Sequence, residues 1–135
     1  GLYSCRYRTQ NSCMGLYPRY VRSLQNGQGA CFAASSSDGR VVGLATARWT
    51  NHDLGGHAYQ IDGFAHQRFA AAWPAVIEAA CTWAYTQGAT VLQAQIAAED
   101  GDKQAVFQRL GFVATGVEEA FNENRLTTWR TAPKA

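Results

Sequence analysis

The sequence has 135 residues, of which 47% are hydrophobic and 16% are charged, with a formal net charge of +2. That composition excludes an intrinsically disordered chain, and the length fits one domain, 1–135, able to bury roughly two-thirds of its unfolded surface. No apolar run approaches a membrane span and the first residues lack the order of a secretion signal, so we expect a soluble, cytoplasmic protein with no membrane partner.

Residues 1–29 are the least regular part of the sequence. The first thirteen fit an irregular arm or a short first strand, and a helical spacing of apolar residues from Leu16 to Leu24 predicts a short helix. Tyrosines and arginines are interleaved here, a mixture that suits nucleic-acid binding as well as a plain surface arm. Because the basic residues thin out after Arg22, we do not expect a nucleic-acid partner.

The clearest local signal in the sequence is a hairpin. Segments 30–36 and 41–49 are apolar and strand-like, and four polar residues, 37–40, separate them. Within that separation, Asp38-Gly39 supplies the positive φ that a tight turn needs. We therefore predict two antiparallel strands joined by this turn.

The stretch 58–88 predicts a strand, a tight turn and one long helix. The strand covers 58–66, and the helix begins at Pro74, which suits a first helical position, and ends before Gly88. Apolar residues recur at helical spacing on one face, at Val76, Ile77, Ala80, Trp83 and Ala84. A strand that leads through small residues into a helix N-terminus directs N–H groups and the helix dipole at one point, which suits an anion.

The rest of the chain predicts a strand, a helix and two more strands. Segment 90–97 is a strand that we expect to lie parallel to 58–66, because a helix connects the two. Asp100-Gly101-Asp102 offers an N-cap for a helix over 103–110, with Ala105, Val106 and Leu110 buried and Gly111 as its end. Segments 112–115 and 125–131 complete the sheet.

This order of elements predicts an α+β fold. We expect a mixed, mostly antiparallel central sheet in a three-layer α/β/α arrangement, with residues 30–131 as its core. Four cysteines, at positions 5, 13, 31 and 81, show neither a C-x-x-C pair nor a zinc-finger spacing, so we expect all four to be reduced thiols. His52, Asp53 and His57 resemble a metal cluster in composition alone, and we expect no metal.

Four stretches resemble the GNAT superfamily of N-acyltransferases over roughly residues 30–130. They are DGRVVGLATARW, the strand AYQIDGFAH, the helix AVIEAACTWAYTQGA, and AEDGDKQAVFQRLGFVATG, which ends in a helix followed by Gly-Phe as in that family. The resemblance implies a GNAT-like fold in which the parallel strand pair splays around a cofactor cleft. It also implies transfer of an acetyl group from acetyl coenzyme A to an amine, by direct attack in a ternary complex.

The resemblance assigns the cofactor contacts to the end of the 58–66 strand and the turn after it. Pantetheine would pair with the backbone near Phe64, Ala65 and His66. The pyrophosphate would lie on the turn that the family writes as Gln or Arg, two residues, Gly, one residue, Gly or Ala. We place that turn at Gln67, Arg68, Phe69, Ala70, Ala71 and Ala72, because the register that begins at Arg68 puts Trp73 where a small residue belongs.

This sequence departs from the family pattern in three places. Alanine replaces glycine in the pyrophosphate turn, which adds a methyl group where backbone must approach phosphate. Phe107 stands where many members carry a tyrosine that protonates the leaving thiolate, within the cofactor site, and the nearest substitutes in sequence are Cys31, His52, His57 and His66. The resemblance also leads us to expect a shortened N-terminal region, because only about 30 residues precede Cys31 where the family has a strand and two helices.

A base is also needed to deprotonate the acceptor ammonium. Asp62 corresponds to an acidic position of the family and is the first candidate, with His66 second. Asp62 also fits a strand-end residue that satisfies a loop N–H, and His66 also fits a structural hydrogen-bonder at a turn.

Two functions from different classes fit these observations. The first is an N-acetyltransferase that acts on an amine-bearing small molecule or peptide. The second is a non-catalytic GNAT-fold binding module that has lost the acid and the loop glycines. A shortened N-terminus would leave the acceptor side open or completed by a partner subunit, so we also expect a homodimer.

Overall fold

The computed structural model describes residues 4–8, 29–50, 57–121 and 124–132. The short helix predicted from Leu16 to Leu24 lies outside these residues, as do His52 and Asp53. The elements, in chain order, are β1 (Ser4–Arg8), β2 (Gly29–Ser35), β3 (Val41–Thr50), β4 (Ala58–Ala65), the 3-10 turn η2 (Gln67–Phe69), α3 (Ala72–Thr86), β5 (Val91–Ala97), α4 (Gly101–Arg109), β6 (Phe112–Phe121) and β7 (Asn124–Thr131).

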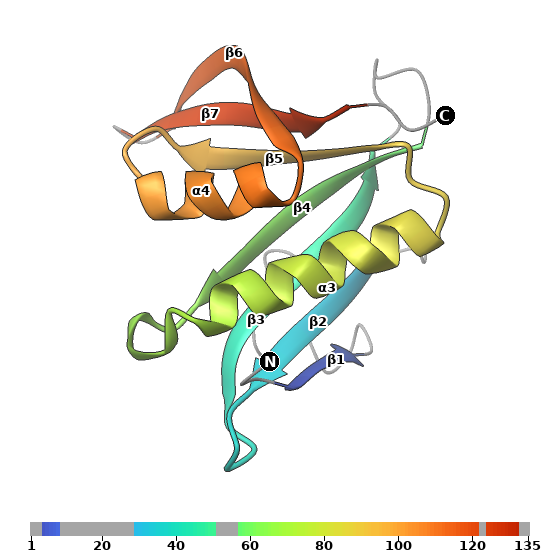
Figure 1. Ribbon diagram of the computed structural model, residues 1–135, viewed down its shortest axis with the longest axis vertical. Coiled ribbons are helices and arrows are strands. Elements are labelled where there is room, and N and C mark those ends of the chain that lie inside the picture. The colour runs from blue at the N-terminus through green and yellow to red at the C-terminus, as the bar shows by residue number, and fades with distance from the viewer. Residues whose placement is uncertain (1–3, 9–28, 51–56, 122–123, 133–135) are drawn as a thin grey trace.

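The seven strands form one mixed sheet in the order β1-β2-β3-β4-β5-β7-β6. All neighbours are antiparallel except β4 and β5, which run parallel as predicted. Their pairing covers Ala58 with Val91 to Gln60 with Gln93 and then stops, although both strands continue. Figure 1 shows the two strands diverging beyond this short seam.

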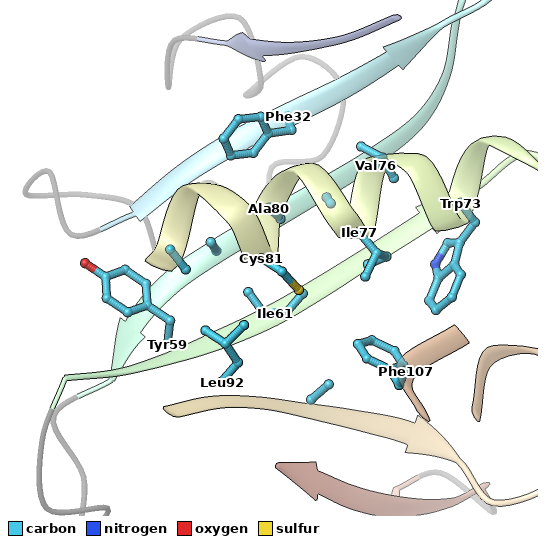
Figure 2. Packing of buried hydrophobic residues seen from close by; sticks show 14 of the residues in the cluster. Phe32, Tyr59, Ile61, Trp73, Val76, Ile77, Ala80, Cys81, Leu92 and Phe107 are labelled. Carbon is cyan, nitrogen blue, oxygen red and sulfur yellow. The ribbon is translucent and has the colours of Figure 1, made fainter. Parts of the chain in front are cut away.

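Helix α3 crosses β2, β3 and β4 and buries its apolar face on one side of the sheet (Figure 1). The predicted face is confirmed at Val76, Ile77, Ala80 and Ala84, while Trp83 is half-buried and contacts the rings of Phe32 and Tyr59. Figure 2 shows how this core continues past Trp73 to Phe107 on α4. Both described helices therefore cover one face of the sheet and share one core.

The opposite face of the sheet begins with a small apolar cluster and becomes polar toward β5. Cys31, Ala33 and Leu44 form the cluster, and Thr46 and Gln60 are buried polar residues of the same face. The α+β class is confirmed by the mixed sheet and its helices. Among the described residues, both helices lie on the other face, so a third layer is not seen in this part of the chain.

The local turn signals are borne out. Gly39 has φ +84° in the β2–β3 turn, where Asp38 accepts from the Arg40 N–H at 3.1 Å. Gly88 and Gly111, with φ of +91° and +90°, follow the ends of α3 and α4. Asp100 caps α4 as predicted and accepts from the Lys103 N–H at 3.1 Å.

Two element boundaries differ from the prediction. Helix α3 begins at Ala72, before Pro74, because alanine favours the helix and proline is tolerated anywhere in the first turn, where N–H groups have no helical partner. Strand β6 continues to Phe121, past a bulge at Gly116, whose φ is +87°. Thr115 holds the bulge, because its hydroxyl donates to Thr128 O and accepts from the Val117 N–H.

Other predictions concerned burial and cysteine chemistry. In α4 the fully buried residue is Phe107, whereas Ala105 is exposed and Val106 and Leu110 are half-buried. The expectation of four reduced thiols is wrong for Cys31, which is disulfide-bonded, while Cys81 is a free buried thiol. Neither described helix has the length and apolar character needed to cross a bilayer.

Candidate functional site

A cavity of about 460 Å³ opens where β4 leaves β5, between the start of α3 and the start of α4. Figure 2 shows Trp73 and Phe107 side by side in this region, between the two diverging strands. The cavity is lined by Phe64, Ala65, Ala70, Trp73, Pro74, Asp100, Asp102, Lys103 and Val106. Three separate segments thus meet there: the end of β4 with its following turn, the first turn of α3, and α4.

Trp73 forms the wall of the cavity between the two helices. Its indole N–H donates to the backbone carbonyl of Gly63 at 3.2 Å, and its ring meets Phe107 edge to face at 5.4 Å. The Lys103 Nζ lies 5.5 Å from the centre of the same ring and 3.7 Å from an Asp100 carboxylate oxygen. The ammonium of Lys103 is therefore held at the cavity by a ring face and an ion pair.

The turn that leads from β4 into α3 leaves the helix N-terminus without a side-chain cap. His66 caps only the preceding 3-10 turn, where its Nδ1 accepts from the Arg68 N–H at 3.3 Å. The N-cap residue of α3 is Ala71, which makes no side-chain cap hydrogen bond. The first N–H groups of a helix lack partners within it, so this end can take an external acceptor.

The alanines of this turn are not strained. Ala70 and Ala71 both have right-handed helical backbone, with φ of −55° and −68°, so neither position requires glycine. Both are exposed, whereas Ala72 is fully buried where α3 meets the sheet. That burial explains a small residue at the last position of the register that begins at Gln67.

The structure brings together some of the predicted cofactor residues. Phe64, which is 39% exposed, Ala65 and Ala70 line one cavity. His66 and Arg68 are exposed on the adjoining turn. Phe107 is 3% exposed, packs between Trp73 and Phe112, and is not among the described residues that line the cavity.

Asp62, the first candidate base, lies on the opposite face of β4 from the helices. Tyr59 and Ile61 point into the helix-covered core, so Gln60, Asp62 and Phe64 point the other way. Phe64 lines the cavity and follows Asp62 by two residues on this face, about 7 Å along the strand. Asp62 itself is not among the described residues that line the cavity.

Burial raises the pKa of the Asp62 carboxyl above its usual range. The Arg48 guanidinium and a hydrogen bond from the Gln60 side chain both act in the opposite direction, but the effect of burial is the larger. A half-buried carboxylate with a raised pKa is a stronger proton acceptor than an exposed one. This environment suits a general base.

The other proposed proton donors and acceptors lie elsewhere. The backbone carbonyl of His57 accepts from the Thr90 N–H at 2.8 Å, at the other end of β4 from the cavity. Cys31 carries no thiol proton, because it is disulfide-bonded. Within the described ranges, no group of three histidine, cysteine or acidic residues could hold a metal ion.

Sequence reasoning missed Lys103 as a cavity residue, because it predicted Lys103 only as the first residue of a helix. For Trp73 it rejected the turn register that begins at Arg68, but it did not locate the contacts of the indole side chain. A hydrogen bond to Gly63 and a ring contact across two helices depend on tertiary packing, which leaves no periodic signal in the sequence. Asp100 was found as a cap, but its place at the cavity was not.

No protein-family model matches this chain, and no curated protein matches it. Solved structures match it over nearly its whole length. The acetyltransferase of the GNAT family from Streptococcus pneumoniae is similar with a TM-score of 0.76 at 14% identity, over 98% of this chain and 99% of that chain.

Two further structures illustrate the same likeness. The ribosomal-protein-alanine N-acetyltransferase from Brucella melitensis gives a TM-score of 0.73 at 14% identity, over 96% of this chain and 99% of that chain. A Salmonella typhimurium protein, solved with its cofactor acetyl-CoA, gives a TM-score of 0.74 at 13% identity, over 100% of this chain and 96% of that chain. At these identities the likeness establishes a shared fold.

Proposed function

We propose that this chain, whose fold is that of the GNAT acetyltransferases, is an N-acetyltransferase that uses acetyl coenzyme A and acts on an amine-bearing small molecule or peptide. The observation that carries the proposal is the cavity at the open seam, which is lined by the end of β4 and by the first turn of α3, whose N-terminus has no side-chain cap. Asp62 lies on β4 two residues before Phe64, which lines this cavity. The S. pneumoniae and B. melitensis structures, named as acetyltransferases, share this architecture.

The residues present fit the cofactor. The turn Gln67–Ala72 leads into the start of α3, which has no side-chain cap and directs the positive end of the helix dipole at a diphosphate, and its exposed alanines need no unusual backbone. Lys103 adds a positive charge, which offsets the carboxylates of Asp100 and Asp102 at the same cavity. Phe64 and Ala65 would flank the pantetheine arm.

Acetyl coenzyme A supplies a thioester whose carbonyl carbon is open to attack by an amine. Asp62 would accept the proton that the acceptor ammonium loses, directly or through a water molecule. His66 remains the second candidate, although its Nδ1 already accepts a hydrogen bond in the turn. Trp73 and Phe107 would exclude water from the helix side of the seam.

The departing thiolate would leave without a proton from Phe107. A thiol has a pKa of about 8.5, so a thiolate is a stable leaving group near neutral pH without a general acid. We therefore expect that activity does not fall at alkaline pH through the ionisation of a tyrosine at this position. The acceptor side would be completed by a second copy of the chain in a homodimer.

Calorimetry with acetyl coenzyme A tests the proposal, together with thiol release in the presence of a panel of polyamines, amino acids and peptides. Lys103→Met should weaken binding roughly tenfold, because it removes a charge-assisted contact with phosphate. Arg109→Met removes an equal charge from the exposed end of the same helix and should leave binding unchanged. Absence of binding to the wild-type chain at millimolar ligand would contradict the proposal.

The binding-module alternative has one observation in its favour, namely that Phe107 is buried in the core and can donate no proton. Tight binding of acetyl coenzyme A without turnover of any amine in the panel would support the module. If the wild-type chain turns over even one amine and Asp62→Asn does not, the binding-module alternative is excluded.

A further inference from the structure

A chain of hydrogen-bonded side chains crosses three neighbouring strands on the polar face of the sheet. It begins at Arg130 on β7, whose Nε donates to Gln93 Oε1 on β5 at 2.8 Å. Gln93 Nε2 donates to Gln60 Oε1 on β4 at 3.1 Å, and Gln60 Nε2 donates to Gln95 Oε1 at 2.6 Å. The chain spans the seam at Gln60 and Gln93, where backbone pairing between β4 and β5 ends. Figure 1 shows these two strands diverging.

The direction of these hydrogen bonds is fixed at the Arg130 end. A guanidinium has only donors, so Gln93 must turn its oxygen toward Arg130 and its NH₂ group toward Gln60. Gln60 must then turn its oxygen toward Gln93, which leaves its NH₂ group facing Gln95 and Asp62. Gln60 is 3% exposed, so a reversed amide would be poorly compensated by water.

The two hydrogens of the Gln60 amide match the two acceptors in front of it. One goes to Gln95 Oε1. The second acceptor is the Asp62 carboxyl, which follows Gln60 by two residues on the same face of β4 and whose pKa burial raises and the Gln60 amide acts to lower. If Gln60 reversed, its carbonyl oxygen would face Asp62, which as a carboxylate can only accept. A lone pair would then replace a donor beside a negative charge.

Among the described residues, the other charged groups near Asp62 do not connect it to Arg130. Among the described residues, β3 presents Arg48, which acts on Asp62 by its charge. Strand β5 presents Gln93 and Gln95, which do not titrate, and the neighbours on β4 are Gln60 and Phe64. Arg130 lies beyond β5, on β7, so its route to Asp62 passes through the two amides.

We propose that Arg130 is a positioning residue for Asp62: it sets the orientation of the Gln93 and Gln60 amides so that Gln60 presents N–H donors to the carboxylate. This rests on the proposed function in giving Asp62 the role of base. With the donors in place the carboxylate stays ionised and fixed in one orientation at the open seam. Arg130 touches neither substrate nor cofactor in this arrangement.

The test measures the pKa of Asp62 in the full chain by carboxyl-carbon NMR, without ligand. Arg130→Met and Gln93→Met should each raise this pKa, because either change frees the Gln60 amide to reverse. The double variant should raise it no further than Gln93→Met alone, since Arg130 acts through Gln93. Arg130→Lys keeps a donor-only group and should restore the wild-type pKa.

Arg125→Met serves as the matched control. It removes the same charge from the same strand, but Arg125 pairs with Glu118 at the exposed edge, so the pKa of Asp62 should not change. An unchanged pKa in both Arg130→Met and Gln93→Met would overturn the proposal. So would additive effects in the double variant, which would indicate direct action by the Arg130 charge. If Arg130→Met does not fold, Gln93→Met and Arg130→Lys decide by the same readout.

Activity then separates this inference from the proposed function. If the enzyme turns over an amine, the acidic limb of kcat/KM should move to higher pH in the variants that raise the pKa of Asp62. Failure to find any turnover, with the predicted order of pKa values intact, would contradict the proposed function and leave the role of Arg130 standing.

Discussion

Asp62 carries a carboxyl whose pKa is raised by burial, and this has a consequence for stability as well as for chemistry. A carboxyl with a higher pKa in the folded chain than its ordinary 3.8 destabilises the fold once the pH rises past 3.8. The full penalty is present above the folded pKa, and it disappears as the pH falls below the ordinary value. The ionised Asp62 carboxyl therefore lowers the free energy of unfolding of the chain.

Asp62→Asn should accordingly lose activity while gaining stability. We expect kcat/KM to fall by about 10²–10⁴-fold, the usual contribution of a general base. The melting temperature should exceed that of the wild type at neutral pH, and the difference should vanish as the pH is lowered past 3.8. Glu119→Gln, an exposed carboxyl on β6, is the control for both measurements. Full activity in Asp62→Asn would contradict its role as base.

Phe107 raises the question whether the missing tyrosine can be restored. Its ring is buried between Trp73 and Phe112, with ring centres 5.4 and 4.7 Å away. A hydroxyl added there would be buried among aromatic carbons, at a cost of about 1–3 kcal/mol if it finds no partner. Phe107→Tyr should therefore lower the melting temperature without raising kcat. A rise in kcat with unchanged stability would show that this position does reach the leaving thiol.

Strand β4 is the element that all parts of the site share. On the face that the helices cover, α3 packs closely against this strand at Gly63. A Cβ added there would lie 2.8 Å from the Leu44 carbonyl oxygen and 2.9 Å from Ile77 Cδ1. The same residue offers its carbonyl to the Trp73 indole. Glycine is thus required at Gly63 by packing, since a backbone oxygen cannot move aside cheaply.

Gly63→Ala should destabilise the chain by about 1–3 kcal/mol, the usual cost of overpacking. It should also weaken binding of acetyl coenzyme A, because α3 and Trp73 must move to relieve the contact. Gly101→Ala is the matched control: an added Cβ meets nothing within 4 Å at this helical position, so stability should stay equal or rise. Equal melting temperatures for Gly63→Ala and the wild type would contradict the packing argument.

Elements whose signals are local were predictable from the sequence. The Asp38-Gly39 turn, the apolar face of α3 and the glycine that ends each helix depend on neighbours within a few residues. The extension of β6 was missed because an edge strand with a bulge carries polar, exposed residues and loses its alternation. The helix α3 was predicted, although with its start at Pro74 instead of Ala72, but its neighbours at the cavity come from α4 and required the fold.

At the scale of the whole molecule, two further expectations can be measured. The sheet ends at β6, whose Val113 and Val117 are 66% and 49% exposed. We expect a homodimer at micromolar concentration by light scattering, and Val113→Lys and Val117→Lys should shift it toward monomer if this edge forms the contact. Monomer alone in the wild type would contradict the expectation.

The disulfide of Cys31 bears on where the protein is found. Disulfide bonds persist in oxidising compartments and are rare in the cytosol, so this bond is at odds with the cytoplasmic expectation, which stays a prediction. Alkylation of the denatured chain with and without reductant should show one bond that includes Cys31. Cys81, whose thiol pKa burial raises to about 12, should be modified only after unfolding.

The seam between β4 and β5 divides the sheet into two parts that are also consecutive in sequence. Strands β1 to β4 with α3 precede the link at Gly88–Thr90, and β5 to β7 with α4 follow it. Three backbone residue pairs join the two parts, together with the glutamine side chains and the contact of Trp73 with Phe107. The sheet therefore consists of two consecutive parts of the chain. We expect that cleavage within the link between them yields two fragments, which recover the fold only when they are mixed.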